Sequence, residues 1–184
     1  MESLARNLNT PLEWVQPKSL QNRYELRAGD ALYAVIEFLK LFGSLATAIS
    51  ADGRWTFKRV GFFNPRISIR NAGEETDLGM FYPRWTGTEG KLQMANGAAF
   101  TWKAANFWAT QFAWQMEAGE PFIVYRQGVE DATISDWFKT QARVEVRPEA
   151  RSLPQISLLV MLGWYLMILK QQDDAGAVAA TSAT

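Results

Sequence analysis

The amino-acid sequence predicts a mainly β protein, either an antiparallel sandwich or a closed barrel, with one buried hydrophobic helix near the C-terminus. Three observations support this fold class. Between residues 20 and 148, short segments alternate apolar with polar side chains, and turn-forming residues separate these segments. An uninterrupted apolar run then covers residues 156–169. The length of 184 residues corresponds to a single domain.

The alternation is clearest in four segments, in which an apolar side chain occupies every second position. These segments are 23–28, 66–70, 111–117 and 142–147. Because successive side chains of a strand point to opposite faces, each segment is predicted to be a strand with one buried face and one face in water.

Residues that tolerate a positive φ angle lie between the predicted strands, where hairpins require them. The strongest hairpin signals are Asp52-Gly53 and Asn96-Gly97, because these dipeptides favour the turns that match the twist of the flanking strands. No helical pattern separates the strands, and parallel strands need long crossover connections. The strands are therefore predicted to pair antiparallel.

The apolar run at 156–169 predicts a helix that is hydrophobic on every face and must be enclosed by protein or lipid. Ser152 is the expected N-cap, Pro154 fits a first turn, and Lys170 lies at the negative end of the helix dipole. At 1.5 Å per residue the run spans roughly 21 Å, which is shorter than the ~30 Å hydrocarbon core of a bilayer. We therefore expect a buried core helix, with a C-terminal membrane anchor as the alternative.

Three local signatures, with the order of elements over residues 20–170, resemble a known fold. They are ADGRWTFKR at 51–59, the predicted strand 97–102 after a hairpin, and Gly163-Trp164-Tyr165 near the end of the apolar run. The pattern resembles the tubby-like fold of tubby C-terminal domains, LURP-one-related proteins and phospholipid scramblases. The resemblance implies a closed antiparallel β-barrel of about 12 strands wrapped around one buried hydrophobic C-terminal α-helix.

This resemblance also implies how the chain is divided. Residues 1–19 are expected to be an N-terminal extension, and residues 20–170 a single barrel domain with its central helix at about 153–170. Residues 171–184 are expected to form a flexible tail, because small and weakly polar side chains predominate there.

Composition excludes several kinds of chemistry. The chain has no His and no Cys, so imidazole bases, thiol nucleophiles and His- or Cys-ligated metals are ruled out. We expect no cofactor, no metal and no catalysis. Its 19 basic and 19 acidic residues cancel, which argues against nucleic-acid binding, because that binding needs a basic surplus. The first residues contain no apolar signal segment, so a cytoplasmic location is expected.

A basic group is the candidate binding site, because Arg and Lys hold phosphate groups. By alternation, several of its members share the outer face of one hairpin, while Trp55 and Phe57 point inward. The alternative is that these charges only solvate the wet face of the sheet. The predicted ligand-binding residues are Arg54, Lys58, Arg59, Arg66 and Arg70.

Two other clusters are interpreted as structural. Aromatic residues near Asn106 are expected to pack the barrel wall against the helix rather than line a ligand pocket; they are Trp102, Phe107, Trp108, Phe112 and Trp114. The acidic residues are expected to lie in solvated loops, because they lack the spacing of calcium ligands; they are Glu74, Glu75 and Asp77, then Glu130, Asp131 and Asp136.

The predicted function is that of a non-enzymatic binding or scaffold module, peripheral to a membrane and in contact with anionic phospholipid head groups. Tubby domains bind phosphoinositides through exposed Lys and Arg, which the resemblance implies for this chain. One alternative is a C-terminally membrane-anchored protein with a β-rich cytoplasmic domain. Another is a small-ligand-binding protein or an enzyme that uses carboxylates or a Lys.

Overall fold

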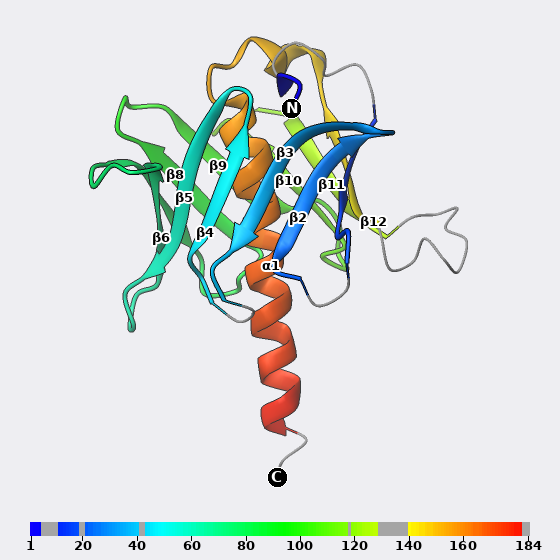
Figure 1. Cartoon of the computed structure of the whole chain (residues 1–184). Coiled ribbons are helices and arrows are strands. Elements are labelled where there is room, and N and C mark those ends of the chain that lie inside the picture. Colours follow the sequence, from blue (N-terminus) through cyan, green and yellow to red (C-terminus); the bar gives the residue numbers. More distant parts are fainter. Residues whose placement is uncertain (5–10, 19–20, 41–42, 118, 129–139, 182–184) are drawn as a thin grey trace.

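The computed structural model describes residues 1–4, 11–18, 21–40, 43–117, 119–128 and 140–181. They form a closed barrel of 12 antiparallel strands with a C-terminal helix in its centre (Figure 1). The predicted mainly β fold class is confirmed, and the barrel is formed rather than the sandwich. The strands are β1 (Leu12–Val15), β2 (Arg23–Ala28), β3 (Ala31–Phe38), β4 (Ala46–Ser50), β5 (Gly53–Val60), β6 (Arg66–Asn71), β7 (Asp77–Pro83), β8 (Glu89–Met94), β9 (Ala99–Ala104), β10 (Gln111–Gln115), β11 (Pro121–Gln127) and β12 (Thr140–Val146).

The barrel is a meander that closes where β1 pairs with β12. In the closing pair Leu12 lies opposite Val144, and the side chains of Leu12 and Trp14 are buried in the core. The barrel therefore begins before residue 20, in contrast to the predicted extension over 1–19. A four-residue strand offers too short an alternation to be recognised in the sequence, and only its pairing with β12 reveals it.

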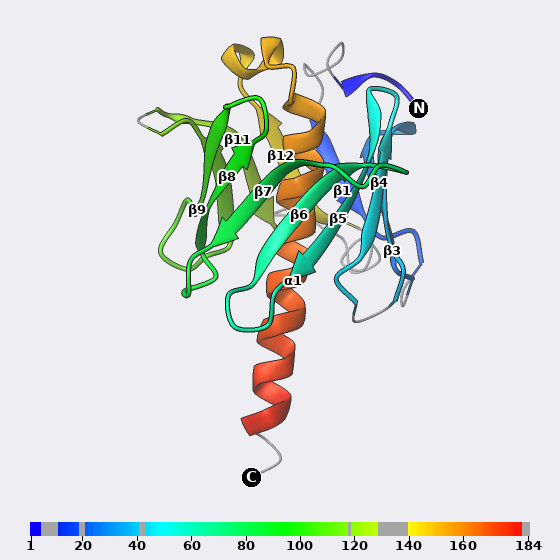
Figure 2. The ribbon, with the colours of Figure 1, turned by 90° about the vertical axis from the view of Figure 1, so that its left-hand side faces the viewer.

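The helix α1 (Ile156–Thr181) follows a short 3₁₀ helix, η2 (Pro148–Ser152). Every residue from 156 to 169 is buried, which confirms the predicted core helix (Figure 2). Its ends differ from the prediction. Pro154 lies before the first turn, and the helix continues to Thr181 where a flexible tail was expected. Among the described residues, no helix has the length and the apolar character that crossing a membrane requires.

Two polar side chains of the barrel wall bind the backbone of α1 in the middle of the core. The Trp114 indole donates a hydrogen bond to the Leu159 carbonyl oxygen at 3.0 Å, and the Tyr125 hydroxyl bonds to the carbonyls of Leu159 and Val160 at 3.0 and 2.9 Å. Burial raises the pKa of Tyr125, so this hydroxyl stays protonated as a donor. Gly163 lies against the Tyr125 ring, so α1 approaches the barrel wall closely at this position.

The loops of a meander alternate between the two ends of the barrel. Asp52, in the β4–β5 turn, accepts a hydrogen bond from the Ser157 hydroxyl at 2.6 Å, so this turn lies at the end where α1 begins. Arg59, at the other end of β5, bonds to Asp173 near the end of α1. We call these the entry end and the exit end. The loops β1–β2, β3–β4, β5–β6, β7–β8 and β9–β10 belong to the exit end, beyond which α1 projects (Figures 1 and 2).

Candidate functional site

The hairpin β5–β6 brings four of the five predicted basic residues together on its outer face. Trp55 and Phe57 are buried and point inward, as predicted. The register places Arg70 beside Thr56 and Arg66 beside Val60, on the face opposite to these aromatic rings. The outer face therefore carries a basic ladder, which we define as Arg54, Lys58, Arg66 and Arg70.

One member of the basic ladder is engaged by a carboxylate. The Arg70 guanidinium donates a hydrogen bond to Asp77 at 2.6 Å, and the Ser68 hydroxyl donates to the same oxygen at 2.6 Å. The bonds from Ser68 and Arg70 lower the pKa of the Asp77 carboxyl. Within the described part of the chain, the other three ladder side chains form no ion pair, and their charges face solvent without a bound carboxylate.

Arg59 does not belong to the basic ladder. It shares the inward face of β5 with Trp55 and Phe57, and its guanidinium forms a bidentate pair with Asp173 of α1, with bonds of 2.9 and 2.7 Å. These bonds raise the pKa of the Arg59 guanidinium. Alternation along β5 could have separated Arg59 from Lys58. Its partner could not be foreseen, because the residues following the apolar run were expected to be flexible.

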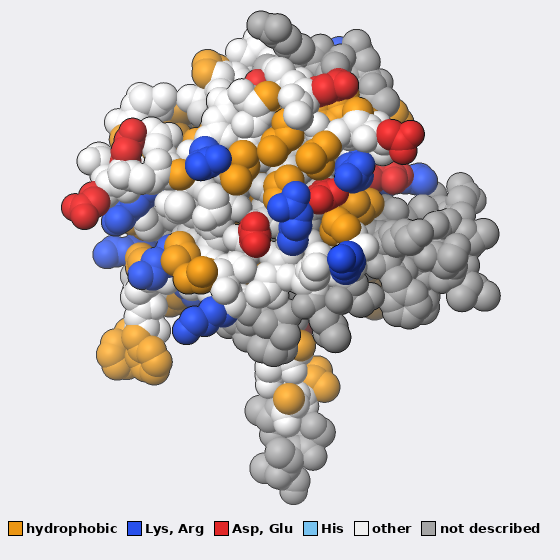
Figure 3. All heavy atoms as spheres, viewed as in Figure 1, with side chains coloured by type: hydrophobic (Ala, Val, Ile, Leu, Met, Phe, Trp, Pro, Cys, Tyr) orange, Lys and Arg blue, Asp and Glu red, His pale blue; other side chains and the backbone are white. Residues whose placement is uncertain are grey.

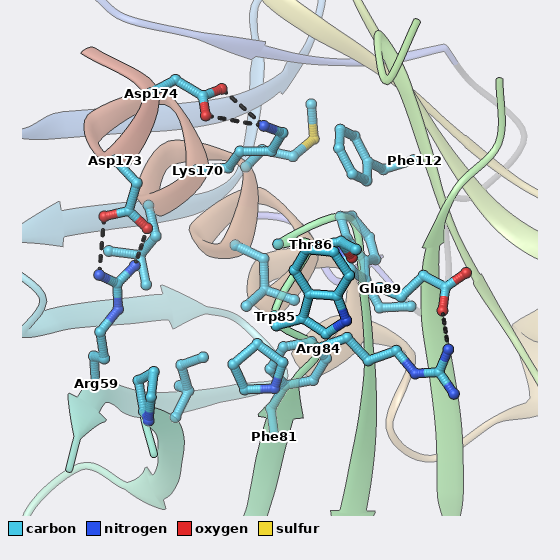
Figure 4. Close-up of a pocket in the computed structure, with 18 of the residues that line it drawn as sticks. Arg59, Phe81, Arg84, Trp85, Thr86, Glu89, Phe112, Lys170, Asp173 and Asp174 are labelled. Carbon is cyan, nitrogen blue, oxygen red and sulfur yellow. Dashed lines mark hydrogen bonds and ion pairs between the residues drawn. The ribbon is translucent and has the colours of Figure 1, made fainter. Parts of the chain in front are cut away.

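A cavity of about 450 Å³ opens at the exit end, between α1 and the hairpins β5–β6 and β7–β8 (Figure 4). Its inner surface is apolar and includes Phe81, Trp102, Phe112 and Leu166. Trp85, in the β7–β8 loop, borders the cavity (Figure 4). The cavity was not predicted, because it depends on how far the helix fills the barrel.

Charged pairs surround the mouth of the cavity (Figure 4). Besides the Arg59–Asp173 pair, Lys170 lies 2.8 Å from Asp174, and Arg84 lies 3.1 Å from Glu89. The carboxylates of Asp173 and Asp174 each pair with a different basic side chain, Arg59 and Lys170, so the two carboxylates do not share one partner. An apolar interior with a charged mouth fits an amphiphilic ligand, whose chain and head group need different surroundings.

The aromatic cluster near Asn106 is only partly internal. Trp102, Phe112 and Trp114 are buried in the core as predicted, with Trp102 stacked on Phe112. The prediction was wrong for Phe107 and Trp108, whose exposed fractions are 91% and 79%. These two residues follow the end of β9 and lie in the β9–β10 loop. Two consecutive aromatic residues cannot both face inward on a strand, and this signal in the sequence was missed.

The acidic clusters do not form a cation site in the described part of the chain. Glu74 and Glu75 lie in the β6–β7 turn and are exposed, as expected, whereas Asp77 is engaged by Arg70. The second cluster, Glu130, Asp131 and Asp136, lies outside the described residues. Among the described residues, no group of three or more carboxylates is close enough to hold a metal ion.

Comparison of the chain with protein families, with curated proteins and with solved structures finds no match. Function is therefore inferred from two features of the molecule: the basic ladder on the wall and the side chains at the exit end.

Proposed function

We propose that this chain is a non-catalytic binding module with a tubby-like architecture, which binds anionic phospholipid head groups at the cytoplasmic surface of a membrane. The proposal rests on Arg54, Lys58 and Arg66, whose charged groups are exposed and have no ion-pair partner among the described residues. They share one outer face, and no described carboxylate forms an ion pair with them. Guanidinium and ammonium groups in this state are free to donate to phosphate oxygens.

The energetics favour a surface over a single bound anion. Each Lys or Arg close to an anionic leaflet contributes about 1 kcal/mol, and this attraction falls off within a Debye length of ~8 Å at physiological salt. The ladder spans one hairpin, so several of its members can meet the same surface. The net charge of zero does not oppose this binding, because only charges near the surface contribute appreciably.

Vesicle flotation tests the proposal. We expect the intact chain to float with vesicles of phosphatidylcholine and phosphatidylserine, and with vesicles that contain a phosphoinositide, but weakly with phosphatidylcholine alone. Replacing Arg54, Lys58 and Arg66 together by Ala is expected to weaken binding to the anionic vesicles by roughly 100-fold, since three contributions of about 1 kcal/mol are lost.

A matched control variant removes three positive charges from a different part of the barrel wall. Arg126, Arg143 and Arg147 lie on β11, on β12 and just after β12, and each pairs with a carboxylate. Their joint replacement by Ala is expected to leave flotation within a fewfold of the wild type. Equal binding of the intact chain to neutral and anionic vesicles, or equal losses in the two triple variants, would contradict the role of the ladder.

A further inference from the structure

The loops at the exit end carry most of the large apolar side chains that the described structure exposes. Five of these side chains are aromatic, and they lie in three hairpin loops of the exit end. We call these five side chains the aromatic tips. Their exposed fractions are Phe62 91%, Phe63 96%, Trp85 97%, Phe107 91% and Trp108 79%. Phe62 and Phe63 are in the β5–β6 loop, Trp85 in the β7–β8 loop, and Phe107 and Trp108 in the β9–β10 loop.

These side chains have no structural role that explains their exposure. Phe62 contacts Phe63 edge to face, with ring centroids 5.1 Å apart, and Phe107 contacts Trp108 in the same way at 5.2 Å. The rings thus contact their loop neighbours while most of their surface remains in water. Large apolar side chains exposed together at one end of a protein mark a site of interaction with a protein or a membrane. Trp at such a position is characteristic of the boundary between lipid and water.

The charges of the loops differ between the two ends of the barrel. At the exit end, every charged residue in the described loops is basic: Lys18, Lys40 and Arg84. In the described hairpin loops of the entry end, every charged residue is acidic: Asp30, Asp52, Glu74, Glu75, Glu117 and Glu120. The connection between β12 and η2 at the same end adds Arg147, which pairs with Glu120. The segment 129–139 lies outside this comparison. In the described hairpin loops, a negatively charged surface therefore meets carboxylates at the entry end and basic side chains at the exit end.

We propose that the aromatic tips insert into the interfacial region of an anionic phospholipid bilayer, and that the barrel docks obliquely with the hairpins β5–β6, β7–β8 and β9–β10 leading. This inference rests on the proposed function and adds the docking surface and the orientation. Lys58 and Arg66 lie within a few residues of Phe62 and Phe63 in sequence, so they reach head-group phosphates when these rings insert. Figure 3 shows apolar side chains at the lowest point of this hairpin and basic side chains on the wall above it.

The projecting part of α1 is compatible with this orientation. It reaches beyond the loops of the exit end (Figures 1 and 2), so it approaches the bilayer together with the aromatic tips. Its last turns, residues 175–181, contain no charged side chain. Asp173 and Asp174, which precede these turns, are neutralised by Arg59 and Lys170. When α1 approaches lipid, the carboxylates of Asp173 and Asp174 therefore meet the medium of low dielectric constant as ion pairs and not as unpaired charges.

Binding and fluorescence experiments on the intact chain test the inference. The variant Phe63→Ala/Trp85→Ala/Phe107→Ala removes one ring from each leading loop, and the exposure of these rings means that its thermal melt should match the wild type. We expect its affinity for vesicles of phosphatidylcholine and phosphatidylserine to fall by about tenfold per ring. The control variant Tyr82→Ala/Met116→Ala removes partly exposed apolar side chains outside these loops and is expected to bind like the wild type.

Brominated phosphatidylcholine in the same vesicles provides a readout that depends on insertion. We expect it to quench part of the wild-type Trp fluorescence, and expect that quenching to disappear in Trp85→Phe/Trp108→Phe, whose Phe side chains preserve apolar character.

The outcomes separate this inference from the proposed function. If the wild type does not prefer anionic vesicles, both are overturned. If it prefers them but the three-ring variant binds equally and bromine does not quench Trp85 or Trp108, only the docking surface is overturned. If the wild type self-associates without binding vesicles and the three-ring variant is monomeric in analytical ultracentrifugation, the tips bind a second copy of the chain and the inference is wrong.

Discussion

Replacing Leu159 by Asp is expected to prevent the chain from folding stably. Leu159 is fully buried in the first turn of α1 and belongs to the hydrophobic core cluster, which contains no charged residue. A carboxylate there loses its hydration and gains no cationic partner, or must take up a proton to become neutral. A cost of roughly 5 kcal/mol is comparable with the whole stability of a small domain, which is about 5–15 kcal/mol. Circular dichroism and urea unfolding measure the loss directly.

The matched control is Leu39→Asp, which introduces the same charge at a loop position where the side chain is 71% exposed. Its free energy of unfolding is expected to lie within about 0.5 kcal/mol of the wild type. A cooperative unfolding transition for Leu159→Asp at the same urea concentration as the wild type would show that α1 does not form the centre of the barrel.

The second large effect is expected at Gly163. A Cβ atom added there would overlap the Tyr125 ring, so Gly163→Leu must displace either that ring or the helix. Displacement also breaks the bonds from the Tyr125 hydroxyl to the carbonyls of Leu159 and Val160. Overpacking and the lost buried hydrogen bonds together are expected to cost more than about 3 kcal/mol. Thermal unfolding would show a decrease in Tm on the order of 10 °C.

The same helix contains a control for the glycine itself. Gly176 has no neighbouring atom where a Cβ would be placed, so Gly176→Ala is expected to stabilise the chain by up to about 1 kcal/mol through helix propensity alone. Gly163→Ala is expected instead to lower the free energy of unfolding. This loss should be smaller in the variant Tyr125→Leu, which lacks the Tyr125 ring. A decrease in stability of similar size at both glycines would contradict the contact with Tyr125.

Comparison of strands shows where the alternation of side chains carries information. In β6 and β10, five or more residues of regular pattern predicted both the strand and its buried face. In β1 the pattern covers four residues, and the strand exists because β12 offers it a partner across more than a hundred residues of sequence. Short closing strands therefore require the tertiary structure, since their stability comes from distant pairing.

In the candidate site, too, local alternation predicted some features, whereas others depended on the tertiary structure. Alternation placed Lys58 and Arg66 on one outer face, since that depends only on local geometry. It did not place Arg59 beside Asp173, because this contact requires the helix to continue past the apolar run and to lie inside the barrel. Phe107 and Trp108 were assigned to the barrel wall because aromatic residues alternate with Gln and Ala in this segment, but β9 ends before them and they lie in a loop.

By itself the sequence determined the fold class, the antiparallel pairing, the burial of the apolar helix and the absence of His and Cys chemistry. These properties follow from side-chain type and local periodicity. The tertiary structure alone decided that the barrel closes through β1, that the cavity opens beside α1, and that aromatic and basic loops meet at one end. The reason is that the meander brings alternate loops to the same end, where residues distant in sequence form one surface.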